Sequence, residues 1–237
     1  MFRMIAFFIK MFFYLIKSLP PMKKALKLDK QGLKKERDEL IFPYVQDWAG
    51  FCIRETKSTV EVRGIENLPQ SGAMVFIGNH QGNMDIPILL SSIPRPIAFI
   101  SKIEILKIPI ISKWMKLMQC VFLDRKSMKK SVEAMHEAVE KVKEGYSMVI
   151  FPEGTRSKGG PVKDFKAGSF KLAFQAEAPI VPVTIDGSWR IYEEHKSLRS
   201  GKVTLTIHPA VNTKGLTKEE QQEIPKKVRE TVVSALS

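Results

Sequence analysis

Cysteine is scarce in this chain, and the arrangements that bind disulfides or zinc are missing. Only two cysteines occur in 237 residues, Cys52 and Cys120, with no paired spacing and no nearby cluster of Cys or His. This excludes a disulfide framework and gives no support to any metal site, and a reducing compartment suits such a chain best. Internal repeats and low-complexity tracts are also absent, which excludes solenoid and fibrous architectures.

Acidic residues are few relative to basic ones. The chain holds 38 Lys and Arg against 25 Asp and Glu, so its formal net charge is +13. Such a surplus attracts nucleic acid, an anionic membrane surface or phosphorylated substrates. No nucleic-acid-binding motif is present, and the surplus is concentrated near apolar N-terminal segments, so we expect no nucleic-acid partner. Apolar residues make up 44% of the chain, which is typical of a globular protein.

Residues 1–19 lack the uninterrupted apolar run of a membrane-spanning helix, although most of their side chains are large and apolar. Arg3, Lys10 and Lys17 recur every seven residues, which places them on one stripe of an α-helix. A lysine at the centre of a spanning helix costs about 2.5 to 3.5 kcal/mol, whereas in a helix lying flat its charge stays among water and headgroups. We therefore predict an interfacial helix rather than a spanning one, with Phe8 and Phe12 on the immersed face.

Two alternatives for this first helix are less favoured. A signal peptide is a poor fit, because Lys10 splits the apolar run and no small-residue cleavage site follows Leu19. A helix docked on the protein's own core would need most of its surface covered. Residues 41–53 form a second apolar segment, rich in aromatic side chains, which suits either an interfacial aromatic belt or a core.

Together these segments, joined by a basic connector, predict an amphipathic two-helix membrane motif over residues 1–57. We expect it to bind anionic lipids at the cytoplasmic face of the cell membrane.

From about residue 58 short apolar runs alternate with helical stretches, the pattern of an α/β domain over residues 58–237. Helices are expected between the strands, including 129–144 and a last helix opened by a capping box from Thr217 to Glu220. In such sheets the functional site lies beyond the carboxyl ends of the strands. The predicted strands are 59–63, 73–79, 96–100, 120–123, 147–151, 180–185 and 202–208.

The first candidate site follows strand 73–79, where His80 precedes Asp85 by five residues across a turn that contains glycine. The carboxylate can fold back to accept from one imidazole nitrogen and leave the other free as a general base. This is the orienting half of a catalytic triad, with the nucleophile supplied by the substrate. Two simpler interpretations stay open: Asp85 as a helix N-cap and His80 as a packed side chain.

Further polar residues follow neighbouring strands. The loop after strand 147–151 reads Phe-Pro-Glu153-Gly154-Thr155-Arg156-Ser. Its arginine suits a bidentate phosphate contact, although a salt-bridged surface turn is an alternative. Strand 120–123 delivers Asp124 and Arg125, for which a self-contained ion pair is the simpler interpretation. Lys102 adds a cation after strand 96–100.

At these residues the sequence resembles the glycerolipid acyltransferases of the lysophosphatidic acid acyltransferase (PlsC) type. The resemblance covers roughly residues 58–210. One departure is that many members have glycine where Gln119 or Cys120 stands, which we expect to alter packing only. The matching blocks are His80 to Asp85, Val-Phe-Leu-Asp-Arg125, Phe-Pro-Glu-Gly-Thr-Arg-Ser from 151 to 157 and Val181-Pro182-Val183, with Ser101-Lys102 between the first two.

The resemblance implies a mixed sheet flanked by helices and an O-acyltransferase activity. A fatty acyl group would move from acyl carrier protein or coenzyme A to the free sn-2 hydroxyl of lysophosphatidic acid, giving phosphatidic acid. His80 would take the proton from that hydroxyl while Asp85 orients the ring, with no acyl-enzyme and no cofactor beyond the thioester co-substrate. The other implied site residues are Lys102, Arg125 and Arg156, which would bind phosphate, and Glu153, Gly154 and Thr155, which would shape the acceptor site.

Three rival functions are weaker. Another acceptor is one alternative, either glycerol 3-phosphate or a different lysolipid. A non-catalytic lipid-binding protein is a second, but it would have no need of His80 and Asp85. A hydrolase acting through Ser169 would need a G-x-S-x-G turn, which residues 167–171 do not form.

Overall fold

The computed structural model describes residues 2–237, which contain one seven-stranded sheet. All seven predicted strands are present, each within two residues of its expected bounds. They are β1 (Thr59–Arg63), β2 (Val75–Gly78), β3 (Ile97–Lys102), β4 (Val121–Leu123), β5 (Ser147–Ile150), β6 (Ile180–Asp186) and β7 (Lys202–Ile207).

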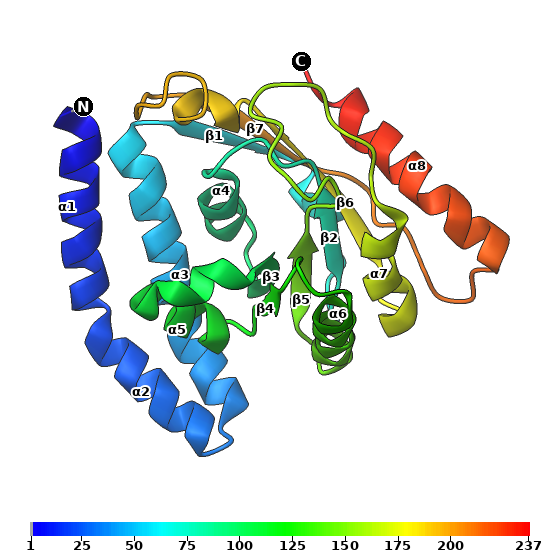
Figure 1. The fold of residues 1–237 in the computed structure, drawn as a ribbon, viewed down its shortest axis with the longest axis horizontal. Coiled ribbons are helices and arrows are strands. Elements are labelled where there is room, and N and C mark those ends of the chain that lie inside the picture. The colour runs from blue at the N-terminus through cyan, green and yellow to red at the C-terminus, as the bar shows by residue number, and fades with distance from the viewer. Residues whose placement is uncertain (1) are drawn as a thin grey trace.

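Helices cover both faces of the sheet, with α3 and α4 on one side and α6, α7 and α8 on the other (Figure 1). At the start of α8 the predicted capping box is present, because Glu220 N donates to Thr217 Oγ1 at 3.2 Å and Thr217 N donates to the Glu220 carboxylate at 2.7 Å. The α-helices are α1 (Phe2–Lys17), α2 (Leu19–Lys30), α3 (Lys34–Thr56), α4 (Asp85–Ser92), α5 (Pro109–Leu117), α6 (Met128–Lys143), α7 (Lys171–Ala176) and α8 (Lys218–Ser234).

The sheet is mixed, as the resemblance implies. Its strand order is β1-β7-β6-β2-β5-β3-β4, and only β6 and β7 pair antiparallel. Five neighbouring strands, β6, β2, β5, β3 and β4, therefore run in the same direction. Their carboxyl ends meet at one edge of the sheet, so the segments that follow these strands lie together.

The centre of the sheet is buried on both faces, because β2, β5 and β6 are runs of apolar residues without polar alternation. The core continues into α3, whose Val45, Ala49 and Cys52 pack in the same cluster as the sheet residues. On α6 the buried residues are Ala134, Ala138, Val139 and Val142.

The N-terminal part is helical, as predicted, but the basic connector is itself a helix. Leu19–Lys30 forms α2, which begins at two prolines and ends at a turn that includes Gly32. Figure 1 shows α1 and α2 along one side of the molecule, with α3 between them and the sheet. The predicted two-helix motif therefore contains three helices.

The cation stripe of α1 lies beside α3: its three cations are exposed, as expected, but two of them also contact that helix. Arg3 Nη2 donates to the Thr56 carbonyl at 3.1 Å, and Lys10 Nζ pairs with the Glu55 carboxylate at 2.7 Å. Both partners belong to the carboxyl end of α3, where the helix dipole is negative and attracts cations. Lys17 is exposed and has no side-chain partner among residues 2–237.

One face of α1 packs on the rest of the protein. For that face the alternative of a helix docked on the protein's own core is therefore correct. Phe7 and Met11 pack against the main core, and the Tyr14 ring stacks on Phe51 with centroids 4.9 Å apart. The opposite face is open: Phe8 is 61% exposed and Phe12 is 58% exposed. Among residues 2–237 no helix is both long and apolar enough to cross a membrane.

We predict that Gly78 is required where β2 meets β6. A Cβ at this position would lie 2.4 Å from the Val183 carbonyl oxygen, so Gly78→Ala should force the strands apart and lower the free energy of unfolding by about 1 to 3 kcal/mol. Thermal unfolding in detergent measures the effect. Gly168→Ala is the matched control, since nothing lies within 4 Å of its Cβ position. Equal stability of the two variants would contradict this close packing.

Candidate active site

His80 and Asp85 form a hydrogen-bonded pair at the carboxyl edge of the sheet. β2 ends at Gly78, and the loop that follows folds back so that His80 Nδ1 lies 2.6 Å from Asp85 Oδ2. Asp85 is fully buried, whereas the His80 side chain is 20% exposed. With Nδ1 facing the carboxylate, Nε2 is left as the nitrogen with no partner among residues 2–237. This is the geometry expected of an oriented general base.

Asp85 does not act as a helix N-cap, so that alternative interpretation is wrong. It is the first residue of α4, and its carboxylate makes no capping bond to that helix. Oδ2 instead accepts from the backbone N–H groups of Gln81 at 2.7 Å and Gly82 at 2.9 Å. Oδ1 accepts from the hydroxyl of Ser188, beyond the end of β6. The four donors satisfy both oxygens of this buried carboxylate.

The His80 ring is held flat against Phe151, the residue that follows β5. The two ring centroids are 4.2 Å apart and the planes differ by 11°. The His80 backbone is fixed as well, because its N–H donates to Glu153 Oε1 at 2.7 Å and its carbonyl accepts from Ser157 N at 2.7 Å. The loop after β5 therefore supports the histidine from two sides.

Glu153 supports this loop from inside the protein. The side chain is buried. Oε2 accepts from Lys163 N at 3.1 Å, and Oε1 accepts from His80 N. Burial raises the pKa of Glu153, whereas the two backbone donors act in the opposite direction. It makes no ion pair with Arg156, whose salt bridge is instead to Glu193 on another segment. In the same loop Gly154 has φ of +70°, and Thr155 is exposed and accepts from Lys163 Nζ at 3.0 Å.

Arg125 and Asp124 do not form the simple ion pair that sequence favours. Arg125 Nη1 donates to the Gly154 carbonyl, which joins the end of β4 to the loop after β5. Asp124 turns the other way, accepting from Lys126 N at 3.1 Å and lying 3.6 Å from Lys130 Nζ. The arginine therefore has no carboxylate partner within residues 2–237 and stays exposed at the edge.

Arg156 is anchored by groups on two other segments. Its Nη1 donates to Asn83 Oδ1, in the loop between His80 and Asp85, and to Glu193 Oε1 at 3.0 Å. The Arg156 side chain is 34% exposed, whereas that of Glu193 is 2% exposed. Nε and Nη2 have no partner among residues 2–237, so this guanidinium keeps donors for an anion.

Lys102 is joined to the others only through the sheet. It is the last residue of β3, exposed, and in register with Leu123 at the end of β4. Its side chain makes no hydrogen bond within the described part of the chain. Hydrogen bonds thus join His80 to Asp85 and to Glu153. Arg125 and Arg156 contact Gly154 and Asn83 in the same two loops, and Lys102 lies on a neighbouring strand end.

An apolar cavity of about 520 Å³ begins beside this loop. Asn83 and Met84, which lie between His80 and Asp85, form part of its wall. The rest of the lining comes mainly from α1, α3, α4 and α5 and includes Phe7, Met11 and Trp114. The cavity therefore connects the His80 loop to the N-terminal helices, and its chemistry suits an aliphatic chain.

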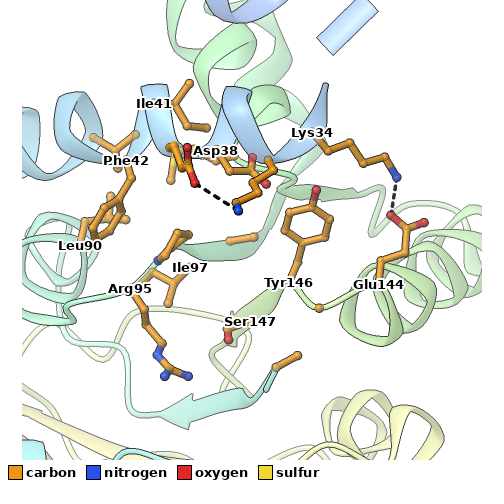
Figure 2. A pocket seen from close by; sticks show the side chains of 18 of the residues that line it. Lys34, Asp38, Ile41, Phe42, Leu90, Arg95, Ile97, Glu144, Tyr146 and Ser147 are labelled. Atoms are coloured by element: carbon orange, nitrogen blue, oxygen red, sulfur yellow. Dashed lines mark hydrogen bonds and ion pairs between the residues drawn. The ribbon is translucent and has the colours of Figure 1, made fainter. Parts of the chain in front are cut away.

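A second hollow, of about 700 Å³, contains none of the predicted site residues. It lies at the opposite ends of β2, β3 and β5, against α3 (Figure 2). Its charged groups have partners in the protein: Lys34 Nζ pairs with Glu144 at 2.9 Å, and Arg95 donates to the Gly72, Pro69 and Gln70 carbonyls. The larger hollow is therefore not the candidate site.

Within residues 2–237 no three His, Cys, Asp or Glu side chains are grouped so that they could hold a metal ion. Cys52 and Cys120 are buried free thiols, and burial raises the pKa of each to about 12. Ser169 lies in a short 3₁₀ turn and makes no hydrogen bond to His80. Ser169 is therefore not paired with the candidate base.

Sequence reasoning missed the residues that hold the loop from β6. Asn79 exchanges two hydrogen bonds with the Ile185 backbone, and Gln81 Oε1 accepts from Gly187 N at 2.9 Å and Ser188 N at 3.2 Å. These contacts join segments about a hundred residues apart in the sequence, so no local pattern predicts them. Position along the chain was the usable signal, because Gly187 and Ser188 lie two and three residues beyond the predicted strand 180–185.

The acyltransferase family model matches residues 59–186, so this chain belongs to the acyltransferase family, and the resemblance seen in the sequence is confirmed. The match contains the His80 loop, Arg125 and the loop around Glu153.

Relatives agree with this assignment. The chain is 31% identical over 176 residues to a 1-acyl-sn-glycerol-3-phosphate acyltransferase of Borreliella burgdorferi, covering 74% of this chain and 70% of the relative. The human 1-acyl-sn-glycerol-3-phosphate acyltransferase alpha is 30% identical, covering 74% of this chain and 62% of the human protein. A crystal structure of the 1-acyl-sn-glycerophosphate (LPA) acyltransferase PlsC from Thermotoga maritima superposes with a TM-score of 0.75 at 29% identity, covering 93% of this chain and 95% of that one.

Proposed function

We propose that this protein is a 1-acylglycerol-3-phosphate O-acyltransferase with His80 as its general base. The observation that carries the proposal is the buried Asp85 carboxylate bonded to His80 Nδ1, in a loop whose Asn83 and Met84 line an apolar cavity and within a family of acyltransferases. His80 Nε2 takes the proton of the sn-2 hydroxyl of lysophosphatidic acid as the oxygen attacks a thioester carbonyl. The thiol of acyl carrier protein or coenzyme A leaves, and phosphatidic acid is the product.

The apolar cavity gives the donor's acyl chain a place near the base. Its lining is supplied by apolar side chains, and Asn83 and Met84 bring it to the loop that carries His80. A bound aliphatic chain would keep the thioester near the histidine and exclude water, which competes with the acceptor for the acyl group. The reaction then needs no acyl-enzyme and no further cofactor.

The acceptor's phosphate would bind the cations of the same edge. Arg125 and Arg156 are held by Gly154, Asn83 and Glu193, so they are oriented before any substrate arrives. Lys102 adds an exposed charge from the end of β3. Glu153, Gly154 and Thr155 shape the loop from which these groups project.

The open face of α1 would lie in the cytoplasmic leaflet of the cell membrane. Large apolar side chains dominate this face, and anionic lipids would attract the surplus of positive charge. The acceptor would then reach the site from the leaflet. The exposed apolar residues of α1 are Phe2, Ile5, Phe8, Ile9, Phe12, Phe13 and Ile16.

The first test of this function removes the base. His80→Ala should lower kcat by about a hundredfold or more, and Asp85→Asn should also lose most of the rate, because the hydroxyl is a poor nucleophile until it is deprotonated. Purified protein is assayed with lysolipids and glycerol 3-phosphate, using both thioester donors. His136→Ala, on an exposed histidine of α6, is the matched control. Wild-type kcat in folded His80→Ala protein would rule out the general-base role.

A second test separates phosphate binding from chemistry. Arg156→Ala and Lys102→Ala should raise KM for lysophosphatidic acid by about tenfold or more, since a charge-assisted hydrogen bond contributes about 1.5 to 3 kcal/mol. KM for a neutral lysolipid should change little. Lys107→Ala, an exposed cation beyond β3, serves as the control. If both variants kept the wild-type preference for phosphorylated acceptors, neither side chain would bind the phosphate.

The membrane proposal predicts that α1 anchors the protein through its apolar face. Exchanging Phe8 and Phe12 for Glu should release the protein from vesicles that contain anionic lipid, whereas salt should weaken binding of the wild type only in part. Co-sedimentation measures the bound fraction. The control exchanges Met128 and Val132 of α6 for Glu, two apolar residues that are 82% and 49% exposed. Unchanged sedimentation of the α1 variant would show that another surface binds the lipid.

A further inference from the structure

We infer that Ser188 is a positioning residue for the His80–Asp85 pair, holding the carboxylate in the orientation that the reaction requires. The inference rests on the proposed function of that pair. Ser188 lies just beyond the segment that the family model covers, and no sequence pattern predicted a role for it.

The two oxygens of Asp85 are used very differently. Oδ2 is crowded, with His80 Nδ1 at 2.6 Å and the N–H groups of Gln81 and Gly82 at 2.7 and 2.9 Å. Oδ1 has one donor among residues 2–237, the Ser188 hydroxyl. Ser188 therefore supplies the single bond that fixes the second oxygen and stops the carboxylate from turning.

Because both partners are buried, loss of this hydrogen bond would be costly in free energy. Asp85 and Ser188 are both 0% exposed, so bulk solvent does not reach either side chain. A charged oxygen left buried without a donor is strongly disfavoured, and the carboxylate would turn or shift to find another partner. Any such movement changes the length and direction of the bond to His80 Nδ1.

The position of Ser188 is itself fixed by the loop it serves. Gln81 Oε1 accepts from Gly187 N and Ser188 N, and Asn79 exchanges two bonds with Ile185. Gly187 has φ of +93°, a conformation that turns the chain toward the loop and that glycine adopts without strain. The end of β6 and the His80 loop thus form one hydrogen-bonded unit, in which Ser188 contacts Asp85 and not the imidazole.

The test compares Ser188→Ala with Thr213→Val in the full-length, purified protein. Thr213 is also buried, and its hydroxyl donates to a backbone carbonyl, that of Ala178, at 2.9 Å, away from the pair. Ser188→Ala should lower kcat by roughly ten- to a hundredfold, as a displaced reacting group does, with KM for the acceptor within about twofold of wild type. Thr213→Val should leave both constants unchanged.

A second readout does not depend on turnover. In protein labelled with ¹⁵N-histidine, the ring nitrogen shifts of His80, assigned by their absence in His80→Ala, report the bond to Asp85. They should move in Ser188→Ala and stay in place in Thr213→Val. The inference is overturned if kcat or the nitrogen shifts are unchanged in Ser188→Ala, or if Thr213→Val changes them equally. Failure of the wild type to transfer acyl groups would overturn the proposed function, whereas the shifts would still decide whether Ser188 controls the pair.

Discussion

The candidate site depends on how one buried negative charge is compensated. Asp85 lies inside the protein, where an unpaired carboxylate is strongly disfavoured, and four donors surround it. Three come from the loop after β2 and the fourth from the chain after β6. Because all four must point at two oxygens, this charge fixes the loop, the imidazole and the end of a neighbouring strand relative to one another.

Buried carboxylates and exposed cations have different roles at this edge of the sheet. Glu153 accepts two backbone N–H groups and holds the loop after β5 under His80, although its motif suggests a substrate contact. The arginines, in turn, are oriented by the Gly154 carbonyl and by Glu193 and keep other donors free. Buried carboxylates therefore shape the site, and partly exposed cations are left to meet an anion.

Local sequence patterns predicted the positions of the strands well, but they predicted the contacts of the candidate site only in part. Apolar runs located all seven strands and hence the edge where polar residues gather. Contacts such as Ser188 with Asp85, 103 residues apart, or Glu153 with His80, 73 apart, arise only when the sheet assembles, so no spacing announces them. On α1 the seven-residue spacing correctly predicted that the cations share one stripe. It did not predict that two of these cations contact the carboxyl end of α3. At Gln119 the departure from glycine is more than packing, because its φ is +64°.

α1 separates two apolar environments: its inner side lines the cavity beside the His80 loop, and its outer side is open. If a chain filled the cavity and a lipid surface covered the outer side, and if both favoured the helix in its docked position, thermodynamic linkage would make the two ligands cooperative, each raising the affinity for the other by the same factor. Under the proposed function, an enzyme detached from its leaflet would then also hold its acyl donor less tightly.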